Sequence, residues 1–326
     1  MCGICGDIRF NGSSADLSAI SRMAETMVPR GPDGGGFYGA QNAAFGHRRL
    51  KIIDLSDAAR QPMVDSDLGL SIVFNGCIYN YKELREELQQ KGYRFFSQGD
   101  TEVILKAYHA WGQDAVQRLN GMFAFAIYER DSGRVIVARD RLGIKPFYYS
   151  ETADGYRFAS SLPALLKSGG VDTSIDPVAL NHYLSFHAVV PAPRTIFNGV
   201  KKLPPATVAV IEPDGSRVET QYWKIQYGTP ADCLNYSKED WMDGTLEVMR
   251  RAVKRRLVAD VPVGVLLSGG LDSSLIVGLL CEHNHQAVET FSIGFETVNN
   301  EAGDEFKYYD IIADRYQNKN HKIQVE

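Results

Sequence analysis

The chain has 326 residues, a formal net charge of −5 and 44% hydrophobic residues. This length allows two domains of ordinary size, each with its own core. The slightly acidic charge gives no reason to expect nucleic acid or an anionic membrane surface as a partner. No stretch approaches the ~20 apolar residues of a bilayer span, and no basic and apolar leader is present. Five scattered cysteines argue against a disulfide framework, so we expect a cytoplasmic enzyme.

The first two hundred residues predict two groups of short strands interrupted by helices. Alternation and helical spacing of apolar residues mark these segments. Such blocks predict sheets packed face to face, with helices outside them. Strands are expected over 3–10, 43–55, 70–75, 122–128, 135–138 and 147–149 and near Phe158, Val208 and Val218, and helices over 16–27, 81–91 and 101–119.

From about Ser237 the pattern changes to alternating helices and strands. The run at 263–267 is almost wholly apolar, which is typical of a parallel strand buried on both faces. The order predicts the β-α-β-α-β beginning of a doubly wound α/β sheet. Its elements are expected over 238–257 (helix), 263–267, 272–282 (helix), 289–295, 305–316 (helix) and 322–325. Pro, Gly and polar residues cluster over 214–236, so we expect one domain over 1–215 and a second over 216–326.

Cys2 follows the initiator methionine directly, and its small side chain favours removal of that methionine. One residue would then carry both a thiol and a free α-amine, and an amine with a pKa near 8 can accept the proton of a thiol with a pKa near 8.5. The spacing of Cys2 and Cys5 also matches a C-x-x-C metal or redox motif. No second such pair follows at zinc-ligand spacing, which favours a small buried hydrophobe at Cys5.

Several short motifs surround this cysteine in the sequence. They are Met1-Cys-Gly-Ile-Cys-Gly6, Arg30-Gly-Pro-Asp33, Gly46-His-Arg-Arg-Leu50, Asn75-Gly-Cys-Ile-Tyr-Asn80, Gly99-Asp-Thr-Glu102, Gly121-Met-Phe-Ala-Phe125 and Ala138-Arg-Asp-Arg-Leu-Gly-Ile-Lys-Pro146. Together they resemble the glutaminase domain of class II glutamine amidotransferases, in the version attached to asparagine synthetases. The resemblance covers essentially all of the first two hundred residues. It implies an α+β N-terminal-nucleophile fold, an αββα sandwich.

The resemblance also implies roles for individual residues. Cys2 would attack the side-chain amide of L-glutamine, and Asn75 with the Gly76 N–H would stabilise the oxyanion. Arg49 would hold the substrate carboxylate and Asp100 its ammonium group. Taken without the resemblance, Arg49 could be a surface charge and Asp100 a helix N-cap. The substrate-binding residues expected on this basis are Arg49, Leu50, Lys51, Ile52, Ile53, Asn75, Gly76, Cys77 and Asp100.

Position 77 departs from the family pattern. Asparagine synthetases usually carry a glutamate there, which helps to bind the substrate ammonium. Cys77 supplies no such charge unless it ionises, so Asp100 would carry that interaction alone. The departure leaves the glutaminase assignment in place and weakens any expectation of glutamine affinity.

The second predicted domain opens with Leu267-Ser-Gly-Gly-Leu-Asp-Ser-Ser274 between the apolar run and a helix. Glycines, hydroxyls and a helix N-terminus form an anion cradle, although an ordinary glycine turn is the plain alternative. The lysine of a G-x-x-x-x-G-K-[ST] loop is missing. The pattern resembles the pyrophosphate loop of ATP pyrophosphatases, which cleave ATP between its α and β phosphates. The resemblance implies ATP contacts at Leu267, Ser268, Gly269, Gly270, Leu271, Asp272, Ser273, Ser274 and Ile293, with Asp272 near Mg²⁺.

The resemblance implies a carbon–nitrogen ligase in which glutamine-derived ammonia amidates a carboxylate activated as an acyl-adenylate. Two acceptors remain open. Aspartate would make asparagine. N-acetylglutaminylglutamine would give a bacterial osmolyte, and the segments 186–194 and 303–306 look closer to that second group. The chain ends before the family's remaining synthetase strands, so we expect a truncated second domain with impaired amidation. A glutaminase alone, a non-enzymatic remnant and a homodimer also remain open.

Overall fold

The structure is a computed structural model that describes residues 1–10, 12–284, 288–295 and 306–325. The chain divides into two compact units, Met1–Gln226 and Tyr227–Glu326, and each is considered by itself. The division lies further along the chain than the expected boundary after position 215. The reason is that Arg217–Gln221 forms a strand that pairs with Thr207–Ile211 and so belongs to the first unit.

Two six-stranded antiparallel sheets form the centre of the first unit. One has the strand order β10-β8-β9-β1-β3-β2 and the other β12-β11-β7-β6-β5-β4. The strands of the first sheet are β1 (Gly3–Arg9), β2 (Gly34–Gly39), β3 (Ala43–Arg49), β8 (Tyr148–Thr152), β9 (Gly155–Ala159) and β10 (Lys201–Lys202). Those of the second are β4 (Met63–Asp65), β5 (Leu70–Ile78), β6 (Gly121–Glu129), β7 (Val135–Arg139), β11 (Thr207–Ile211) and β12 (Arg217–Gln221).

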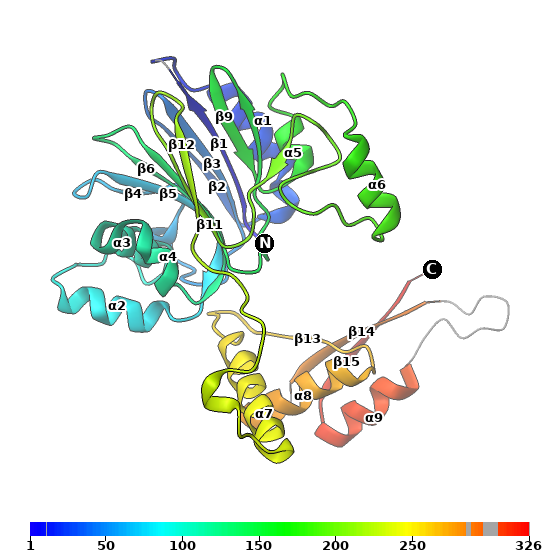
Figure 1. Cartoon of the computed structure of the whole chain (residues 1–326). Coiled ribbons are helices and arrows are strands. Elements are labelled where there is room, and N and C mark those ends of the chain that lie inside the picture. Colours follow the sequence, from blue (N-terminus) through cyan, green and yellow to red (C-terminus); the bar gives the residue numbers. More distant parts are fainter. Residues whose placement is uncertain (11, 285–287, 296–305, 326) are drawn as a thin grey trace. The chain divides into compact units, whose positions relative to one another are not determined.

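Helices cover the outer faces of both sheets (Figure 1). On the first sheet, α1 (Leu17–Thr26) packs on β1 and β3, and α5 (Leu162–Leu166) packs on β8 and β9. On the second, α3 (Asp100–Trp111) packs on β4 and β5 and carries α2 (Tyr81–Gln90) beside it. The order helix, sheet, sheet, helix is the αββα sandwich expected from the sequence. Shorter helices complete the unit: α4 (Ala115–Arg118), α6 (Pro177–Ser185), and the 3₁₀ turns Val28–Arg30, Asp57–Ala59 and Gly112–Asp114.

The core between the sheets is built from alternate residues of facing strands. In β1, Ile4 and Ile8 belong to this core, while Cys5 belongs to a second cluster beneath α1. This alternation follows from the two-residue period of a strand, which sends successive side chains to opposite faces. Phe158 stacks on Phe147 with ring centroids 4.9 Å apart and meets Phe45 edge-on at 5.9 Å. These aromatic contacts tie the first sheet together at its centre.

Two expected elements of the first unit differ from the structure. The strand expected over 43–55 ends at Arg49, because the backbone after it leaves the sheet. The helix expected over 101–119 ends at Trp111, where Gly112 adopts a φ of +57° that an α-helix does not accommodate. The first departure bears on the site, because the segment after Arg49 forms a cavity wall.

The second unit contains a parallel three-stranded sheet, β13-β14-β15. Its elements are a 3₁₀ turn (Ala231–Cys233), α7 (Lys238–Arg255), β13 (Val265–Leu266), α8 (Leu271–Asn284), β14 (Glu289–Phe295), α9 (Phe306–Tyr316) and β15 (Lys319–Val325). Leu267, Val277 and Tyr309 form its buried cluster. The expectation that the run at 263–267 is buried on both faces was wrong for this unit. Leu266 is 73% exposed, since the buried cluster of α8 and α9 covers only the side on which Val265 and Leu267 lie.

In the described part of the chain, no helix combines the length and the apolar character that crossing a bilayer requires.

The aromatic centre of the first sheet predicts an unequal response to loss of a phenyl ring. Phe158→Ala removes a fully buried ring and is expected to lower the free energy of unfolding by about 3–5 kcal/mol. Phe37→Ala removes a ring that is 55% exposed on β2 and should change stability by less than about 0.5 kcal/mol. Urea unfolding of both variants measures the difference, and equal losses would contradict this account of the core.

Candidate active site

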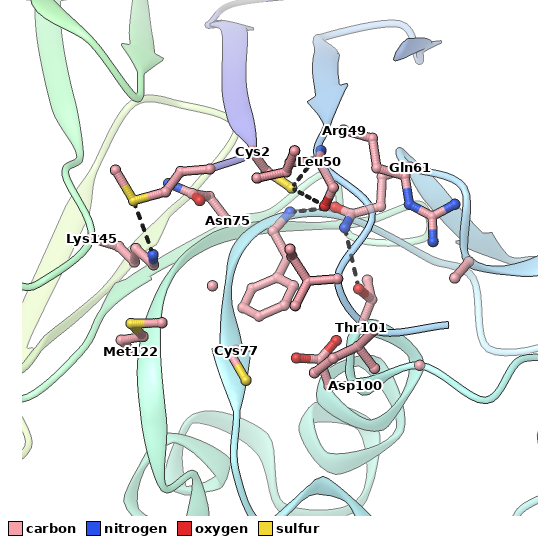
Figure 2. Close-up of a pocket in the computed structure, with 17 residues that line it drawn as sticks. Cys2, Arg49, Leu50, Gln61, Asn75, Cys77, Asp100, Thr101, Met122 and Lys145 are labelled. Carbon is pink, nitrogen blue, oxygen red and sulfur yellow. Dashed lines mark hydrogen bonds between the residues drawn. The ribbon is translucent and has the colours of Figure 1, made fainter. Parts of the chain in front are cut away.

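A cavity of about 260 Å³ lies where the N-terminal segment, the loop after β3, the strand β5 and the start of α3 meet (Figure 2). It brings together nearly all the residues that the sequence singled out in the first unit. The lining residues that the sequence predicted are Cys2, Arg49, Leu50, Ile52, Ile53, Asn75, Gly76, Cys77 and Asp100. The other lining residues, to which the sequence assigned no role, are Met1, Ala59, Gln61, Phe74, Gly99, Thr101, Met122 and Lys145.

Lys51 is the exception among the predicted residues. It does not line this cavity but a neighbouring hollow that it shares with Asp33, Asp57 and Arg60. The Lys51 N–H donates to Asp33 Oδ2 at 2.9 Å, which turns this residue of the loop outward. The prediction that four consecutive residues form the cavity wall was therefore wrong at one position.

Cys2 is held beside the loop that follows β3. Its Sγ lies 3.4 Å from the Leu50 N–H, which donates to it, and 3.6 Å from the Leu50 carbonyl. Arg30 Nε donates to the Cys2 carbonyl at 3.2 Å, which fixes the backbone of the cysteine as well. Burial raises the pKa of the Cys2 thiol, while the Leu50 N–H and the terminal amine act in the opposite direction. The thiol is thus fixed in place but needs a base to become a nucleophile at neutral pH.

Strand β5 presents its backbone to the cavity on every second residue. The Phe74 N–H donates to Gln61 Oε1 at 2.6 Å, and the Ile78 N–H donates to Asp100 Oδ2 at 3.0 Å, both on the side away from β6. Gly76 lies between them and faces Phe123 across the sheet. The backbone of Phe123 is turned toward Asp140, whose N–H donates to the Phe123 carbonyl at 2.8 Å. Because hydrogen-bonding direction alternates along an antiparallel strand, the Gly76 N–H also points away from β6.

Asn75 stands next to this N–H and carries an unusual buried group. The residue is 1% exposed, and its side-chain Nδ2 has no hydrogen-bond partner among the described residues. A buried amide donor without a partner costs free energy of about 1–3 kcal/mol, so such groups are rare unless a ligand completes them. A side chain at position 76 would collide with the Met122 carbonyl, since a Cβ placed on the Gly76 backbone would lie 2.3 Å from that oxygen. Only glycine fits beside this donor.

Arg49 is buried at the end of β3, with 6% exposure. Its guanidinium donates to the carbonyl of Ser56 at 2.8 Å and to that of Asp54. These two bonds use part of the five N–H donors of a guanidinium, and the rest of the fork remains suited to a carboxylate. The interpretation of Arg49 as a surface charge was therefore wrong.

Asp100 is the first residue of α3, and the residue before it, Gly99, caps the helix. The Asp100 side chain is buried, and burial raises the pKa of its carboxyl to about 6 against the hydrogen bond from Ile78. The alternative in which Asp100 is the N-cap residue was wrong by one position, because the helix begins at Asp100 and Gly99 is its N-cap. The Asp100 carboxylate still accepts from the N–H groups of Asp100 and Thr101 as well as from Ile78. Cys77 lies near it in the same wall, and burial raises the pKa of that thiol to about 12. Cys77 is therefore neutral, and Asp100 supplies the negative charge at this end of the cavity.

Several residues that shape the site carried no assigned role in the sequence. Gln61 spans β5 and α3, because its Nε2 also donates to Thr101 Oγ1 at 3.2 Å. His47 lies fully buried behind β5 with Nε2 3.3 Å from the Phe74 carbonyl, and burial lowers the pKa of its ring to about 3. Lys145 reaches the Cys2 end of the cavity from the loop between β7 and β8. His47 and Lys145 sit within quoted motifs, which was the available signal, whereas Gln61 had none.

In the second unit, the segment 267–274 forms the expected strand–loop–helix. The loop is closed by its own hydroxyls, since the Ser268 N–H donates to Ser273 Oγ at 3.2 Å and Ser274 Oγ donates to the Gly270 carbonyl at 2.7 Å. Gly269 has a φ of +73°, and a Cβ there would lie 2.7 Å from the ring of Tyr309. Leu271 and Asp272 are exposed at the start of α8. A compact glycine loop therefore leads into a helix N-terminus, as an anion cradle requires.

Leu267 follows β13 directly, and Ile293, the remaining residue predicted to contact ATP, lies in β14. The Leu267 N–H donates to the Phe291 carbonyl at 2.8 Å, and Ser292 Oγ donates to the Leu267 carbonyl at 2.9 Å. Both backbone groups of Leu267 are thus already bonded to β14. Ile293 is 45% exposed, and its carbonyl accepts a hydrogen bond from Tyr309 at 3.3 Å. The segment 303–305, cited for the choice of acceptor, lies outside the described residues.

Comparison with known proteins agrees with this architecture. The first unit has the fold of N-terminal-nucleophile glutamine amidotransferases. A solved glutamine phosphoribosylpyrophosphate amidotransferase of B. subtilis, complexed with ADP and GMP, matches with a TM-score of 0.52 at 15% identity, covering 87% of this chain and 64% of that one. The structure of an allosteric regulatory enzyme of purine biosynthesis matches with a TM-score of 0.53 at 14% identity, covering 99% and 80%. At such identities the likeness shows the fold alone.

Residues 1–223 match the glutamine amidotransferase domain family, and the chain belongs to that family. Residues 244–326 match the asparagine synthase family. Asparagine synthetase [glutamine-hydrolyzing] 1 of Bacillus subtilis is 40% identical over 302 residues, which is 91% of this chain and 46% of that protein. The corresponding synthetase 3 is 34% identical over 303 residues, covering 91% and 48%. A putative synthetase 2 of Methanocaldococcus jannaschii is 36% identical over 343 residues, covering 98% and 64%. The chain thus spans about half the length of the Bacillus relatives.

The buried carboxyl of Asp100 predicts a pH-dependent cost to stability. Because its folded-state pKa of about 6 exceeds the ordinary value of 3.8, the folded protein holds this proton more tightly than the unfolded chain. The resulting stabilisation is complete below about pH 4 and is lost as the pH rises through 6. Asp100→Asn should therefore raise the free energy of unfolding by about 1–3 kcal/mol at pH 8 and leave it nearly unchanged at pH 4.

Urea unfolding at the two pH values measures this difference. Asp57→Asn, at an exposed carboxylate in a surface ion pair with Arg60, is the matched control and should show no such gain. A loss of stability in Asp100→Asn at pH 8 would contradict the assignment of a strained buried charge.

Proposed function

We propose that the first unit hydrolyses the side-chain amide of L-glutamine with Cys2 as the nucleophile. The observation that carries the proposal is the meeting of three groups in one cavity: the Cys2 thiol, the unpartnered Asn75 Nδ2 and the inward-facing Gly76 N–H. Acyl transfer needs a nucleophile beside two hydrogen-bond donors, and this cavity supplies both. The family membership of residues 1–223 supports the same chemistry.

The nucleophile is activated by its own backbone once Met1 is removed. The thiol proton passes to the α-amine of Cys2, and the thiolate attacks the amide carbon of glutamine. When the tetrahedral intermediate collapses, the carbon–nitrogen bond breaks and the α-ammonium returns the proton to the leaving group, which departs as ammonia. Water then hydrolyses the thioester to glutamate and restores the thiol. His47 is fully buried behind β5 with a pKa lowered to about 3, so it does not serve as the base for Cys2.

The negative oxygen of the tetrahedral intermediate would lie between Asn75 Nδ2 and the Gly76 N–H. Both donors are fixed before substrate arrives, because β5 is held on one side by β6 and on the other by Gln61 and Asp100. Preorganised donors of this kind stabilise the transition state without the cost of rearrangement. The orphaned Asn75 amide would gain its missing partner at that moment.

The two charged ends of free glutamine match two charged residues of the cavity. Arg49 would bind the α-carboxylate, and Asp100 the α-ammonium. Cys77 stands where the related synthetases usually carry a second carboxylate, and the high pKa of its thiol keeps it neutral. Ammonium binding then depends on Asp100 alone, so glutamine affinity should fall as the pH drops below about 6, where this carboxyl gains a proton.

For the second unit we propose binding of ATP at the 268–274 loop. The glycine turn and the N-terminus of α8 would hold the phosphates. The hydroxyls of Ser268, Ser273 and Ser274 would donate to them by turning away from the bonds that they make within the loop. Asp272 would hold Mg²⁺, a cation that prefers carboxylate and phosphate oxygens and would supply positive charge for the phosphates. The acceptor carboxylate would attack the α-phosphate of ATP and release pyrophosphate. Ammonia from the first unit would then attack the carbonyl carbon of the acyl-adenylate and release AMP. This proposal extends the asparagine synthase match of residues 244–326.

The glutaminase proposal predicts separate effects for nucleophile and donor. Cys2→Ala should abolish glutamate release from glutamine. Asn75→Ala should lower kcat by about 10²–10³ with a smaller change in KM, because its donor acts on the transition state. Asn42→Ala, at an amide that donates to the Gly133 carbonyl far from the cavity, is the control and should retain activity. Glutamate release that survives in Cys2→Ala would overturn the proposal, and retention of Met1 on the active protein would overturn its mechanism.

The acceptor is tested by AMP formation. The intact protein, with a complete synthetase domain, is supplied with Mg-ATP, glutamine and either aspartate or N-acetylglutaminylglutamine. The names of the relatives favour aspartate, whereas the resemblance of segment 186–194 favours the dipeptide. We expect one of the two to drive glutamine-dependent AMP release, and Asp272→Asn to suppress it. If glutamate is released but no AMP forms with either acceptor acid, the protein is a glutaminase alone.

A further inference from the structure

Lys145 places a buried positive charge at the Cys2 end of the cavity (Figure 2). Its residue exposure is 5%, and its Nζ donates to the sulfur of Met1 at 3.2 Å. No other partner of this ammonium is found among the described residues. An ammonium has three donors, and a thioether sulfur is a weak acceptor. Burying a charge with so little compensation is costly, which indicates that the charge serves the cavity rather than the core.

The loop that carries Lys145 is rigidly fixed. Asp140 accepts the backbone N–H groups of Ile144 and Lys145, each at 2.9 Å, and that of Phe123 on β6 at 3.1 Å. From the other side Arg139 Nε donates to the Lys145 carbonyl at 2.7 Å. These bonds connect the lysine backbone to β6 and β7. Arg139 and Asp140, two buried charged residues that do not line the cavity, therefore fix the backbone from which the Lys145 side chain extends.

Removal of Met1, which the proposed glutaminase mechanism requires, would take away the thioether partner of Lys145. The side chain would then end beside the newly exposed α-amine and thiol of Cys2. The α-amine of Met1 lies in the same surroundings. Burial lowers the pKa of this amine, Arg30 and Lys145 lower it further, and Cys2 and Asp33 raise it. In turn burial lowers the pKa of Lys145, and the Cys2 sulfur raises it.

We propose that Lys145 is a positioning residue that acts on Cys2 through its charge and favours the deprotonated, reactive form of the thiol–amine pair. The proposal rests on the glutaminase function proposed above and assigns a new residue to it. Lys145 keeps its own proton throughout, and the proton exchanged within the pair moves only between sulfur and nitrogen. A neighbouring cation favours loss of the first proton from the pair, whichever atom releases it.

Other charged and titratable groups around this pair also act on its protons, some in the same direction as Lys145 and some against it. Arg30 and Arg49 act in the same direction as Lys145, since Arg30 lowers the pKa of the terminal amine and Arg49 that of the Cys2 thiol. Their bonds to the Cys2 and Ser56 carbonyls fix where these two charges lie. Asp33 raises the pKa of the terminal amine and Asp100 that of the Cys2 thiol, so both oppose loss of the proton. Asp140 raises the pKa of Lys145 itself, and Cys77 is neutral. The groups that face Cys2 or Lys145 from the surrounding elements are Arg30, Asp33, Arg49, Cys77, Asp100 and Asp140.

The pH profile of glutamine hydrolysis tests the proposal. Lys145→Met retains the length and apolar stem of the side chain and removes its charge, whereas Lys145→Arg retains the charge. The rising limb of kcat/KM in Lys145→Met should move up by about one pH unit, which is about a tenfold loss at pH 7 that is recovered near pH 9. Lys145→Arg and the control Lys82→Met, at an exposed lysine on α2, should keep the profile of the parent protein.

A second readout requires no glutamine turnover. The pH dependence of Cys2 alkylation by iodoacetamide should shift in the same direction in Lys145→Met, with N-terminal processing verified by mass. Urea unfolding checks that Lys145→Met is folded. If it is not, Lys145→Gln, which also removes the charge, is used in its place. An unshifted limb in both assays, or an equal loss of activity at every pH, would overturn the proposal. If the parent protein releases no glutamate, the glutaminase function fails by itself, and the alkylation profile still decides the role of Lys145.

Discussion

The site depends on the two directions in which the backbone groups of β5 point, alternately toward β6 in the sheet and toward the cavity. Through Asn75 and Cys77 it pairs with β6, and through Phe74, Gly76 and Ile78 it points to the open side beyond the end of β4. Gln61 and Asp100 take the N–H groups of Phe74 and Ile78, on either side of Gly76. The Gly76 N–H is thereby presented to the cavity at a fixed position. A shift of one residue in the pairing of β5 with β6 would point the Gly76 N–H into the sheet instead of the cavity.

The cavity concentrates groups that ordinary protein interiors avoid. It holds the unpartnered amide of Asn75, the carboxyl of Asp100 with its raised pKa, and the poorly satisfied ammonium of Lys145. Each of these destabilises the folded chain when no ligand is present, and each matches a charge or dipole of the proposed substrate or nucleophile. The aromatic contacts around Phe158 and the core between the two sheets stabilise the fold and offset the free-energy cost of these groups. Stability and function are thus supplied by different layers of the same unit.

The sequence predicted the layered fold and most of the site, and the failures have physical causes. Strand and helix positions followed from alternation, as in Gly3–Arg9, but the departure of the chain from β3 after Arg49 depends on tertiary contacts of Asp54 and Ser56 with the Arg49 guanidinium. The motif around Asn75 indicated the donors. It did not show that Gln61 and Asp100 hold β5 on its open side, since those contacts join residues far apart in sequence. Lys51 was misplaced because its direction is set by Asp33, a partner in another loop.

The central claim is that Cys2, freed of Met1, is the residue that attacks glutamine. A glutamine analogue with an electrophilic diazoketone in place of the amide tests it most directly, by mass spectrometry of the peptides after incubation. The account predicts one equivalent of label on an N-terminal peptide that begins with Cys2, protection by glutamine, and no label on Cys5 or Cys77, which are buried with neutral thiols. Label at another residue, or an unlabelled Cys2 in a protein that still releases glutamate, would contradict it.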